Sequence, residues 1–173
     1  RRTVVVVNCA SASGPFLNKL SAQGRVIVTA TKSGYEQNLT RFATFFSAAI
    51  LDQDADLDKD EQVSVLEAFL IASNKVEEFY STAGRLATEH ALLEDNGDGK
   101  GTPADWFRGV RAVKKAQDSA VPDGFRAHQL HLIRSPLELQ LAPEVRARRD
   151  QLELEVVKLR DVKSKLSETE YLQ

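Results

Sequence analysis

Oxygen-bearing side chains recur through residues 56–67 at the spacing that a hard cation needs. In the twelve-residue calcium loop of an EF-hand, side chains at positions 1, 3, 5, 9 and 12 bind the ion, and position 7 binds it through its backbone carbonyl. In sequence order, positions 1, 3, 5, 7, 9 and 12 are held by Asp56, Asp58, Asp60, Gln62, Ser64 and Glu67. The pattern predicts a Ca²⁺ site, and we call this stretch the first acidic loop.

The last position fixes the register of the first acidic loop. Aspartate recurs at every second position, so that several frames supply the first three ligands: Asp52, Asp54, Asp56, Asp58 and Asp60. A frame that starts at Asp52 or Asp54 puts a valine at position 12, where calcium needs a bidentate carboxylate. The frame that starts at Asp56 puts Glu67 there, and it is the frame that we expect.

Glu61 departs from the calcium pattern, because position 6 is normally a glycine that turns the chain through a positive φ. A residue with a Cβ atom pays about 1 kcal/mol or more in that conformation. We therefore expect calcium binding to be retained but weakened. The alternative is that the stretch is a solvated acidic turn between two helices.

A second acidic, glycine-rich stretch follows at residues 94–105, which we call the second acidic loop. The calcium pattern places four candidate side-chain ligands at its positions 1, 3, 5 and 12: Glu94, Asn96, Asp98 and Asp105. However, Gly101 stands at position 8, where an apolar residue is expected, and Pro103 stands at position 10. The stretch predicts a weak second site or, as the favoured interpretation, ordinary Asn-Gly and Asp-Gly turns.

Two β-branched runs, at residues 3–7 and 25–31, have the length of strands, and residues 16–22 between them predict a short helix. This order predicts a βαβ unit with parallel, neighbouring strands. Apolar residues at helical spacing predict helices at 37–51 and 65–86, one on each side of the first acidic loop. We therefore expect an α/β protein with an inserted helix-loop-helix region.

Downstream, residues 106–116 predict another short helix, and residues 125–133 predict a third strand. His128 and His131 lie three residues apart in that strand. We therefore expect their side chains to point to opposite faces of the sheet and not to share a metal.

The C-terminal part predicts a long, charged helix that starts near Pro143. Apolar residues spaced by seven form one narrow coiled-coil seam: Val145, Leu152, Leu159 and Leu166. We expect this helix to dock on the body of the protein or to associate weakly with a partner. An isolated, solvated helix held by pairs of Glu with Lys or Arg is the alternative.

Composition narrows the classes of function. A hydrophobic content of 42% supports a buried core, and a net charge of −2 argues against nucleic acid as the main partner. No apolar run approaches twenty residues, so we expect no membrane-spanning segment. A single cysteine excludes an internal disulfide framework. The chain starts with Arg and lacks Met, so we expect it to be a fragment or a processed product.

Residues 4–41 resemble, in their pattern, the caspase-like cysteine peptidases, the clan of caspases, metacaspases, legumains and gingipains. The pattern is an apolar strand, a turn that carries Cys, Ser and Gly at residues 8–14, a helix, and a second strand that leads into Ser33-Gly34. The resemblance implies a nucleophile at the end of the first strand, which is Cys9 or, in an alignment on the Ser-Gly pair, Ser11. It also implies a substrate pocket lined by Ser33 and Gly34.

The same resemblance implies a catalytic histidine upstream of the nucleophile, whereas the three histidines of this chain lie downstream. A thiol without a base is a weak nucleophile at neutral pH, so we expect this chain alone to be inactive. A missing N-terminal portion or a partner chain would have to supply the histidine. For Cys9, a small buried apolar residue at a strand end is an equally good interpretation.

With this resemblance, residues 1–136 are expected to form a partial caspase-like α/β domain with a parallel sheet, interrupted by an EF-hand region at about 41–105. Residues 137–173 would form the coiled-coil-like helix. Two functions follow. The chain is the C-terminal part of a peptidase acting on a peptide substrate, with Ca²⁺ ordering the pocket, or it is a non-catalytic calcium-binding or protein-interaction module on a pseudo-peptidase scaffold. A structural helical adaptor, which uses the C-terminal helix, is a third possible function.

Overall fold

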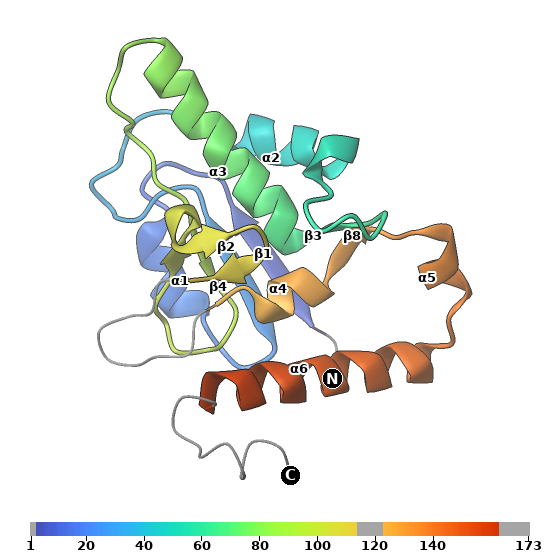
Figure 1. Ribbon diagram of the computed structural model, residues 1–173. Helices are drawn as coiled ribbons and strands as arrows, with labels where there is room; N and C mark the ends of the chain where they lie inside the picture. The colour runs from blue at the N-terminus through green and yellow to red at the C-terminus, as the bar shows by residue number, and fades with distance from the viewer. Residues whose placement is uncertain (1–2, 114–122, 163–173) are drawn as a thin grey trace. The chain divides into compact units, whose positions relative to one another are not determined.

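The computed structural model describes residues 3–113 and 123–162, and Figure 1 shows their arrangement. They form two compact units, of which the first ends at Arg134 and the second starts at Ser135. The first unit is mixed α/β and holds both acidic loops. Among the described residues, no helix has both the length and the apolar character needed to cross a bilayer.

The predicted βαβ unit is present. Strand β1 (Val4–Asn8) lies parallel to β2 (Arg25–Thr29), and helix α1 (Gly14–Leu20) connects them. The sheet continues beyond β2 with β4 (Leu92–Glu94) and β5 (Thr102–Pro103), both antiparallel to their neighbours, in the order β1-β2-β4-β5. The prediction of a parallel sheet is therefore correct for two strands, and the sheet as a whole is mixed.

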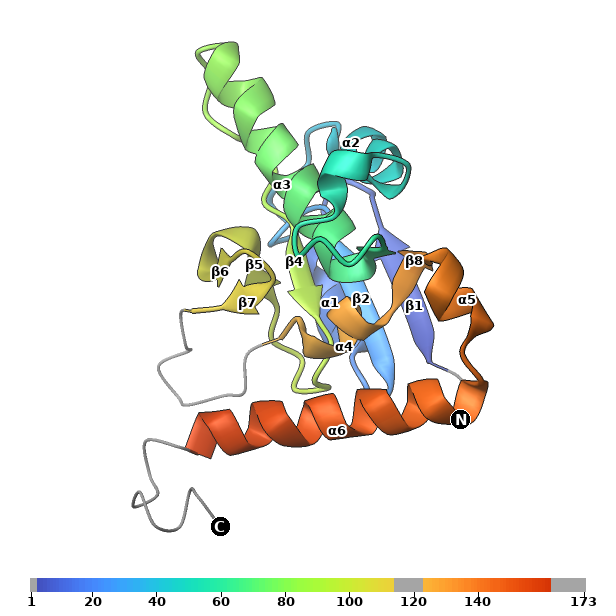
Figure 2. The same ribbon diagram turned by 45° about the vertical axis from the view of Figure 1, so that its right-hand side comes forward.

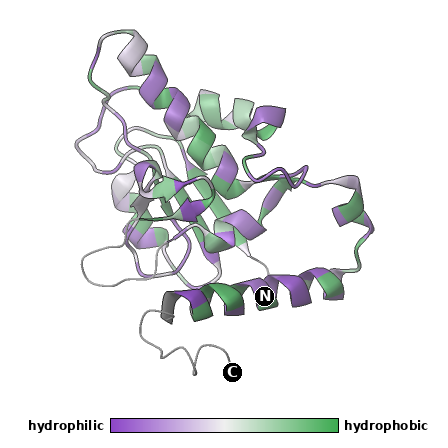
Figure 3. Cartoon of the chain, in the orientation of Figure 1, coloured by the Kyte–Doolittle hydropathy of each residue, from purple (hydrophilic) through white to green (hydrophobic). Residues whose placement is uncertain are grey.

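The core lies on the face of the sheet that α2 (Phe42–Ile50) and α3 (Val65–Thr82) cover. Val26, Val28 and Leu93 pack there with apolar residues of the two helices. Ile27, which lies between the two valines, points to the opposite face, where α1 packs against β2. Strand β2 is thus buried on both faces, as its continuous apolar sequence requires. Figure 2 shows this layering, and Figure 3 shows hydrophobic residues alternating with hydrophilic ones along α3.

Helices α2 and α3 flank the first acidic loop, which confirms a helix-loop-helix arrangement. Between them lie a 3₁₀ turn, η1 (Gln53–Ala55), and a short strand, β3 (Val63–Ser64). Helix α2 starts five residues later than predicted. The buried Glu89 carboxylate accepts hydrogen bonds from the backbone N–H groups of Arg41 and Phe42 and so fixes the helix start there.

Two predicted elements are wrong. The described part of residues 106–116 contains a 3₁₀ turn, η2 (Ala104–Trp106), and a hairpin of β6 (Phe107–Arg108) and β7 (Arg111–Ala112). The hairpin turns at Gly109, whose φ of 57° suits a glycine. Residues 125–133 are not one strand but helix α4 (Phe125–Gln129) followed by β8 (His131–Ile133). The buried Asp95 carboxylate accepts a hydrogen bond from the backbone N–H of Ala127 and supports the start of α4.

The second unit contains α5 (Pro136–Gln140) and the long C-terminal helix α6 (Pro143–Val162), which starts at the predicted proline. Arg149 joins the two helices through a bidentate ion pair with the buried Glu138, at 2.6 and 3.1 Å. Three residues of the predicted seam, Val145, Leu152 and Leu159, are exposed. Apolar and polar residues alternate along α6 in Figure 3. Leu166, the fourth seam residue, lies outside the described residues.

Candidate metal centre

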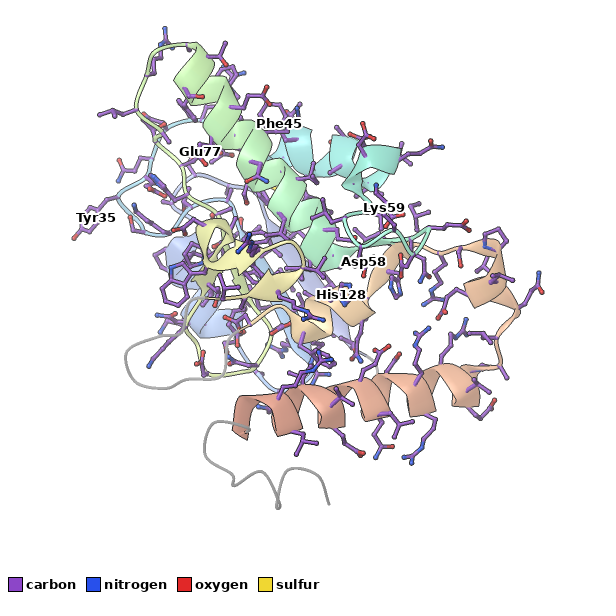
Figure 4. The ribbon with its side chains drawn as sticks, in the orientation of Figure 1. Tyr35, Phe45, Asp58, Lys59, Glu77 and His128 are labelled. Carbon is purple, nitrogen blue, oxygen red and sulfur yellow. The ribbon has the colours of Figure 1, made fainter. Side chains whose placement is uncertain are left out.

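Three carboxylates converge in the first acidic loop. Oxygen atoms of Asp56, Asp58 and Asp60 all lie within 4.8 Å of one another. Calcium binds oxygen ligands at about 2.3–2.6 Å, so two ligand oxygens on one ion are separated by at most about 5 Å. The carboxylates are therefore close enough to share a calcium ion. Figure 4 shows Asp58 on the segment that connects α2 and α3.

The backbone of the loop wraps around Asp56, the residue at position 1. Its Oδ1 accepts a hydrogen bond from the N–H of Asp60, at 3.1 Å, and its Oδ2 accepts one from the N–H of Glu61, at 3.0 Å. The Asp60 carboxylate in turn accepts from the backbone and the side chain of Gln62, at 2.9 and 2.8 Å. These bonds fix the three carboxylates in one curved segment of chain.

The loop conformation requires positive φ angles at two residues with side chains. Lys59, at position 4, has a φ of 65°, and Glu61, at position 6, has a φ of 64°. Residues other than glycine occupy this left-handed region at a cost of about 1–2 kcal/mol. Glu61 thus adopts the positive φ that the calcium pattern requires at position 6. A glycine at this position would adopt the same turn at a lower energetic cost.

Glu67, at position 12, closes the loop in a different way from the three aspartates. Its buried carboxylate accepts hydrogen bonds from the N–H of Leu57, at 2.8 Å, and from the N–H and hydroxyl of Ser64, each at 2.8 Å. Ser64 Oγ accepts from the N–H of Glu67 in return, which completes a capping box at the start of α3. The Glu67 carboxylate therefore lies outside the cluster of three carboxylates in this conformation.

Gln62, at position 7, contributes a buried oxygen. The residue is 6% exposed, and its side-chain Oε1 has no hydrogen-bond partner among the described residues. Gln62 and Asp56 line a cavity of about 470 Å³ beside the loop. A buried carbonyl oxygen without a donor costs about 1–3 kcal/mol.

Two histidines approach the loop from the segment around β8. Strand β3 pairs with β8, and within this contact His128 Nε2 lies 2.9 Å from Asp58 Oδ2 and His131 Nε2 lies 3.7 Å from Asp60 Oδ2. Figure 4 shows His128 pointing toward Asp58. The expectation that these histidines point to opposite faces of a sheet is wrong, because His128 belongs to α4 and not to a strand.

The candidate ligands of the second acidic loop do not all lie in the same part of the protein. Glu94 is fully buried at the end of β4, and Asn96 and Asp98 follow in a tight turn in which Asn96 Oδ1 accepts from the N–H of Asp98. Asp105 lies in η2 and lines a separate cavity of about 330 Å³, together with Glu89 and His90. Position 12 thus faces a different part of the protein from the turn that carries positions 3 and 5.

Sequence reasoning missed a buried pair of aspartates beside the second acidic loop, Asp95 and Asp123, each 4% exposed. Asp123 accepts hydrogen bonds from the N–H of Asp95, at 2.9 Å, and from the hydroxyl of Thr102, at 2.7 Å. Burial raises the pKa of both carboxyls, and that of Asp123 reaches about 8. The only signal in the sequence was a Pro-Asp-Gly turn, which does not indicate burial.

The raised pKa of Asp123 predicts a pH dependence of stability in the metal-free protein. Between about pH 4 and the folded-state pKa of about 8, the folded state binds more protons than the unfolded state, so the free energy of unfolding falls as pH rises. Asp123→Asn imitates the protonated carboxyl and should flatten this fall by at least about 1.4 kcal/mol, the equivalent of one pKa unit. Urea unfolding in EDTA at several pH values measures it, and equal slopes in both proteins would contradict it.

The residues that carry the resemblance to cysteine peptidases lie at the ends of β1 and β2. Cys9 is half-buried, burial raises the pKa of its thiol, and its carbonyl accepts a hydrogen bond from the Thr40 hydroxyl, at 2.5 Å. His90 Nδ1 lies 2.5 Å from Glu36 Oε1. Among the described residues, no hydrogen bond joins the Cys9 thiol to a histidine.

Three other residues of the resemblance are held by packing and local bonds. Ser11 is partly buried in the turn after β1. Ser33 Oγ accepts a hydrogen bond from the N–H of Tyr35, at 3.2 Å, and Gly34 lies against the ring of Pro15. These contacts fix the conformation of the turns. The role of Ser33 and Gly34 in substrate binding stays a prediction.

Comparison of the chain with models of protein families, with curated proteins and with solved structures finds no match.

Proposed function

We propose that this chain is a non-catalytic calcium-binding module whose ion is held in the first acidic loop. The carboxylates of Asp56, Asp58 and Asp60 would bind the ion directly, Gln62 would bind through its backbone carbonyl, and Ser64 through its hydroxyl or a water molecule. The observation that carries the proposal is the convergence of the three carboxylate oxygens within 4.8 Å on a backbone that curls around Asp56.

Charge repulsion supports this assignment. Two unit charges 4 Å apart repel by about 1 kcal/mol in water and by about 4 kcal/mol at an effective dielectric constant of 20. Three carboxylates within 4.8 Å of one another repel in three pairs, and the nearby histidine contacts reach only two of them. A divalent cation at the centre would convert this repulsion into attraction.

Glu67 would complete the site by a change of side-chain conformation. In the described conformation, its carboxylate accepts bonds from Leu57 and Ser64. A swing toward the three aspartates would supply the bidentate ligand at position 12. Ser64 Oγ accepts from the backbone N–H of Glu67 and not from its side chain, so the cap of α3 would survive the swing.

Calcium at this position would act as a clamp between several elements. The loop joins α2 to α3, and its second half pairs with β8 through Val63 and Ser64. Leu66, within the last turn of the loop, and Phe69, just after it, belong to α3 and are fully buried in the core. An ion that fixes the loop would therefore stabilise the start of α3 and its contact with β8. With Glu61 in place of glycine, we expect a Kd on the order of 10⁻⁵–10⁻⁴ M.

Burial raises the pKa of the Cys9 thiol, which disfavours the reactive thiolate and so favours a non-catalytic role. We keep membership of the caspase-like peptidases as a prediction. Peptide hydrolysis with a histidine supplied from outside this chain is likewise a prediction.

Substitution of two nearby aspartates, one at a time, tests both calcium binding and the register of the first acidic loop. Asp58→Asn should weaken calcium binding by at least about tenfold, because it removes a charged ligand. Asp54→Asn should leave the affinity unchanged, because the exposed Asp54 lies in η1, outside the twelve-residue frame. Calorimetric titration with Ca²⁺ measures both. Equal affinities of the two variants would contradict the assignment.

A further inference from the structure

Three alanines lie in one row at an edge of the main sheet. The register of the sheet aligns the ends of β2 and β5 with the start of β4. The residue just beyond each of these strand ends is an alanine: Ala30, Ala91 and Ala104. All three pack with the core on the face of the sheet that α3 covers. Because their side chains are small, they leave space between the sheet and the helix.

This space is a cavity of about 330 Å³, which the three alanines line. Ser73, Val76 and Glu77 of α3 also line it, and their spacing of three and four residues puts them on one face of the helix. The volume lies at the lower end of the range of about 300–1,000 Å³ that is typical of ligand pockets. In open α/β sheets, ligands bind beyond the carboxyl ends of the strands, and this cavity lies where β2 and β5 end.

The charges around the cavity have one sign. Three of its lining residues are acidic: Glu77, Glu89 and Asp105. None of the described residues that line it is a lysine or an arginine. His90 lines the cavity too, but its Nδ1 lies against the carboxylate of Glu36, which is not a lining residue. A positive charge on this imidazole would therefore be paired outside the cavity.

Glu89 brings a buried negative charge to the cavity. The residue is 3% exposed, and both oxygens of its carboxylate accept hydrogen bonds, as an ionised carboxylate does. The donors are the N–H groups of Arg41 and Phe42 and the hydroxyl of Tyr80, all of which are neutral. No ion pair joins Glu89 to a cationic side chain in the part of the chain that the structure describes. A buried charge without a counter-charge is costly, and a cation in the cavity would lower that cost.

We propose that this cavity binds a small organic cation, namely a primary ammonium group attached to an apolar body about the size of one aromatic ring. The ammonium group lies toward Glu77 and Glu89, and the apolar body packs against the three alanines, Val76 and Phe42. The described lining includes neither Cys9 nor any residue of the first acidic loop. The proposal therefore does not depend on calcium binding or on peptidase activity.

Titration of the whole chain with 2-phenylethylamine at pH 7 in EDTA tests the proposal. In ¹⁵N-correlated NMR spectra, the amide resonances of Ala87 and Ala91, which line the cavity, should shift saturably with a Kd on the order of 10⁻⁴–10⁻³ M. Those of Asp58 and Lys59 in the first acidic loop should not shift. The anion 3-phenylpropionate, which carries the same ring, should cause no saturable shift. The proposal is overturned if the amine causes none either, or if both compounds bind equally well.

Two adjacent, exposed glutamates of α3 separate recognition by the cavity from a general effect of charge. Glu77→Gln should weaken amine binding by about threefold, the size of one exposed ion pair. Glu78→Gln makes the same change of charge at a residue that pairs with Lys75 and does not line the cavity, so it should leave the affinity unchanged. Equal affinities of the two variants would contradict the proposal.

A third variant fills the cavity. Ala87 is a partly buried lining residue, and Ala87→Leu adds an apolar side chain there without changing the charge. This variant should lose the saturable shift of Ala91. Binding of the amine to Ala87→Leu with the affinity of the wild type would place the ligand elsewhere and overturn the assignment.

Discussion

Glu67→Gln should remove the stabilisation of the protein by calcium. At a free Ca²⁺ concentration of about 100 times Kd, an ion that binds only the folded state adds about 2.7 kcal/mol to the free energy of unfolding. For a protein of this length, that is a rise of roughly 5–10 °C in Tm. The amide of glutamine cannot bind calcium through two oxygens, so the variant should show little or no rise. Thermal unfolding in excess Ca²⁺ and in EDTA measures the difference.

The same substitution has a smaller effect without calcium. The glutamine side chain has one carbonyl oxygen for the donors that now bond to two carboxylate oxygens, namely the N–H of Leu57 and the N–H and hydroxyl of Ser64. The loss should lower the free energy of unfolding in EDTA by about 1–2 kcal/mol. Glu77→Gln, at an exposed position of the same helix that Figure 4 labels, is the matched control and should keep the full calcium response. A calcium-dependent rise of Tm in Glu67→Gln equal to that of the wild type would refute the role of Glu67.

Gly14→Ala should destabilise the fold strongly. A Cβ atom at residue 14 would lie 2.4 Å from both the carbonyl carbon of Lys32 and the backbone nitrogen of Ser33. These are backbone atoms and cannot turn aside as a side chain can. The free energy of unfolding should fall by about 3 kcal/mol or more, at the upper end of the costs of overpacking. Urea unfolding in EDTA measures this loss.

Gly24→Ala provides the comparison for Gly14→Ala. Gly24 has a φ of 82°, but nothing lies within 4 Å of the position of its Cβ. Its substitution should therefore cost only the backbone strain, about 1 kcal/mol. A loss in Gly14→Ala no larger than that in Gly24→Ala would contradict the close packing of the two turns.

The close packing around Gly14 gives a structural reason for part of the peptidase-like pattern. Ser13 and Thr31 are fully buried and join the two turns through their hydroxyls, at 3.1 Å. The N–H of Gly14 donates to Thr31 Oγ1, at 3.0 Å. The Ser-Gly pair and the threonine after the second strand thus hold the ends of β1 and β2 together. This role explains these residue types without catalysis.

The features that were predictable from the sequence are those encoded over short stretches of chain. The alternating aspartates placed Asp56, Asp58 and Asp60 in one loop, and the structure brings their carboxylates together. The frame that puts Glu67 at the twelfth position stays a prediction. The βαβ unit followed from two β-branched runs with a helix between them. Each of these patterns is read within one element or one loop, where local periodicity is informative.

The features that escaped prediction depend on contacts between distant segments. Residues 125–129 form a helix because the Asp95 carboxylate, some thirty residues upstream, supports its first turn. That helix directs His128 to Asp58, across 70 positions of sequence. The separation of Asp105 from Glu94 likewise follows from the pairing of β4 with β5, which leads the chain away from the loop before position 12.

Calorimetric titration of the wild-type chain with Ca²⁺ at neutral pH, after removal of metal by EDTA and dialysis, shows directly whether the first acidic loop binds calcium. We expect saturable binding in this loop with a Kd on the order of 10⁻⁵–10⁻⁴ M, which persists at physiological salt because several carboxylates and a backbone carbonyl share the ion. The absence of any saturable heat or rise in Tm up to about 10 mM Ca²⁺, well above the range of known extracellular calcium sites, would contradict it.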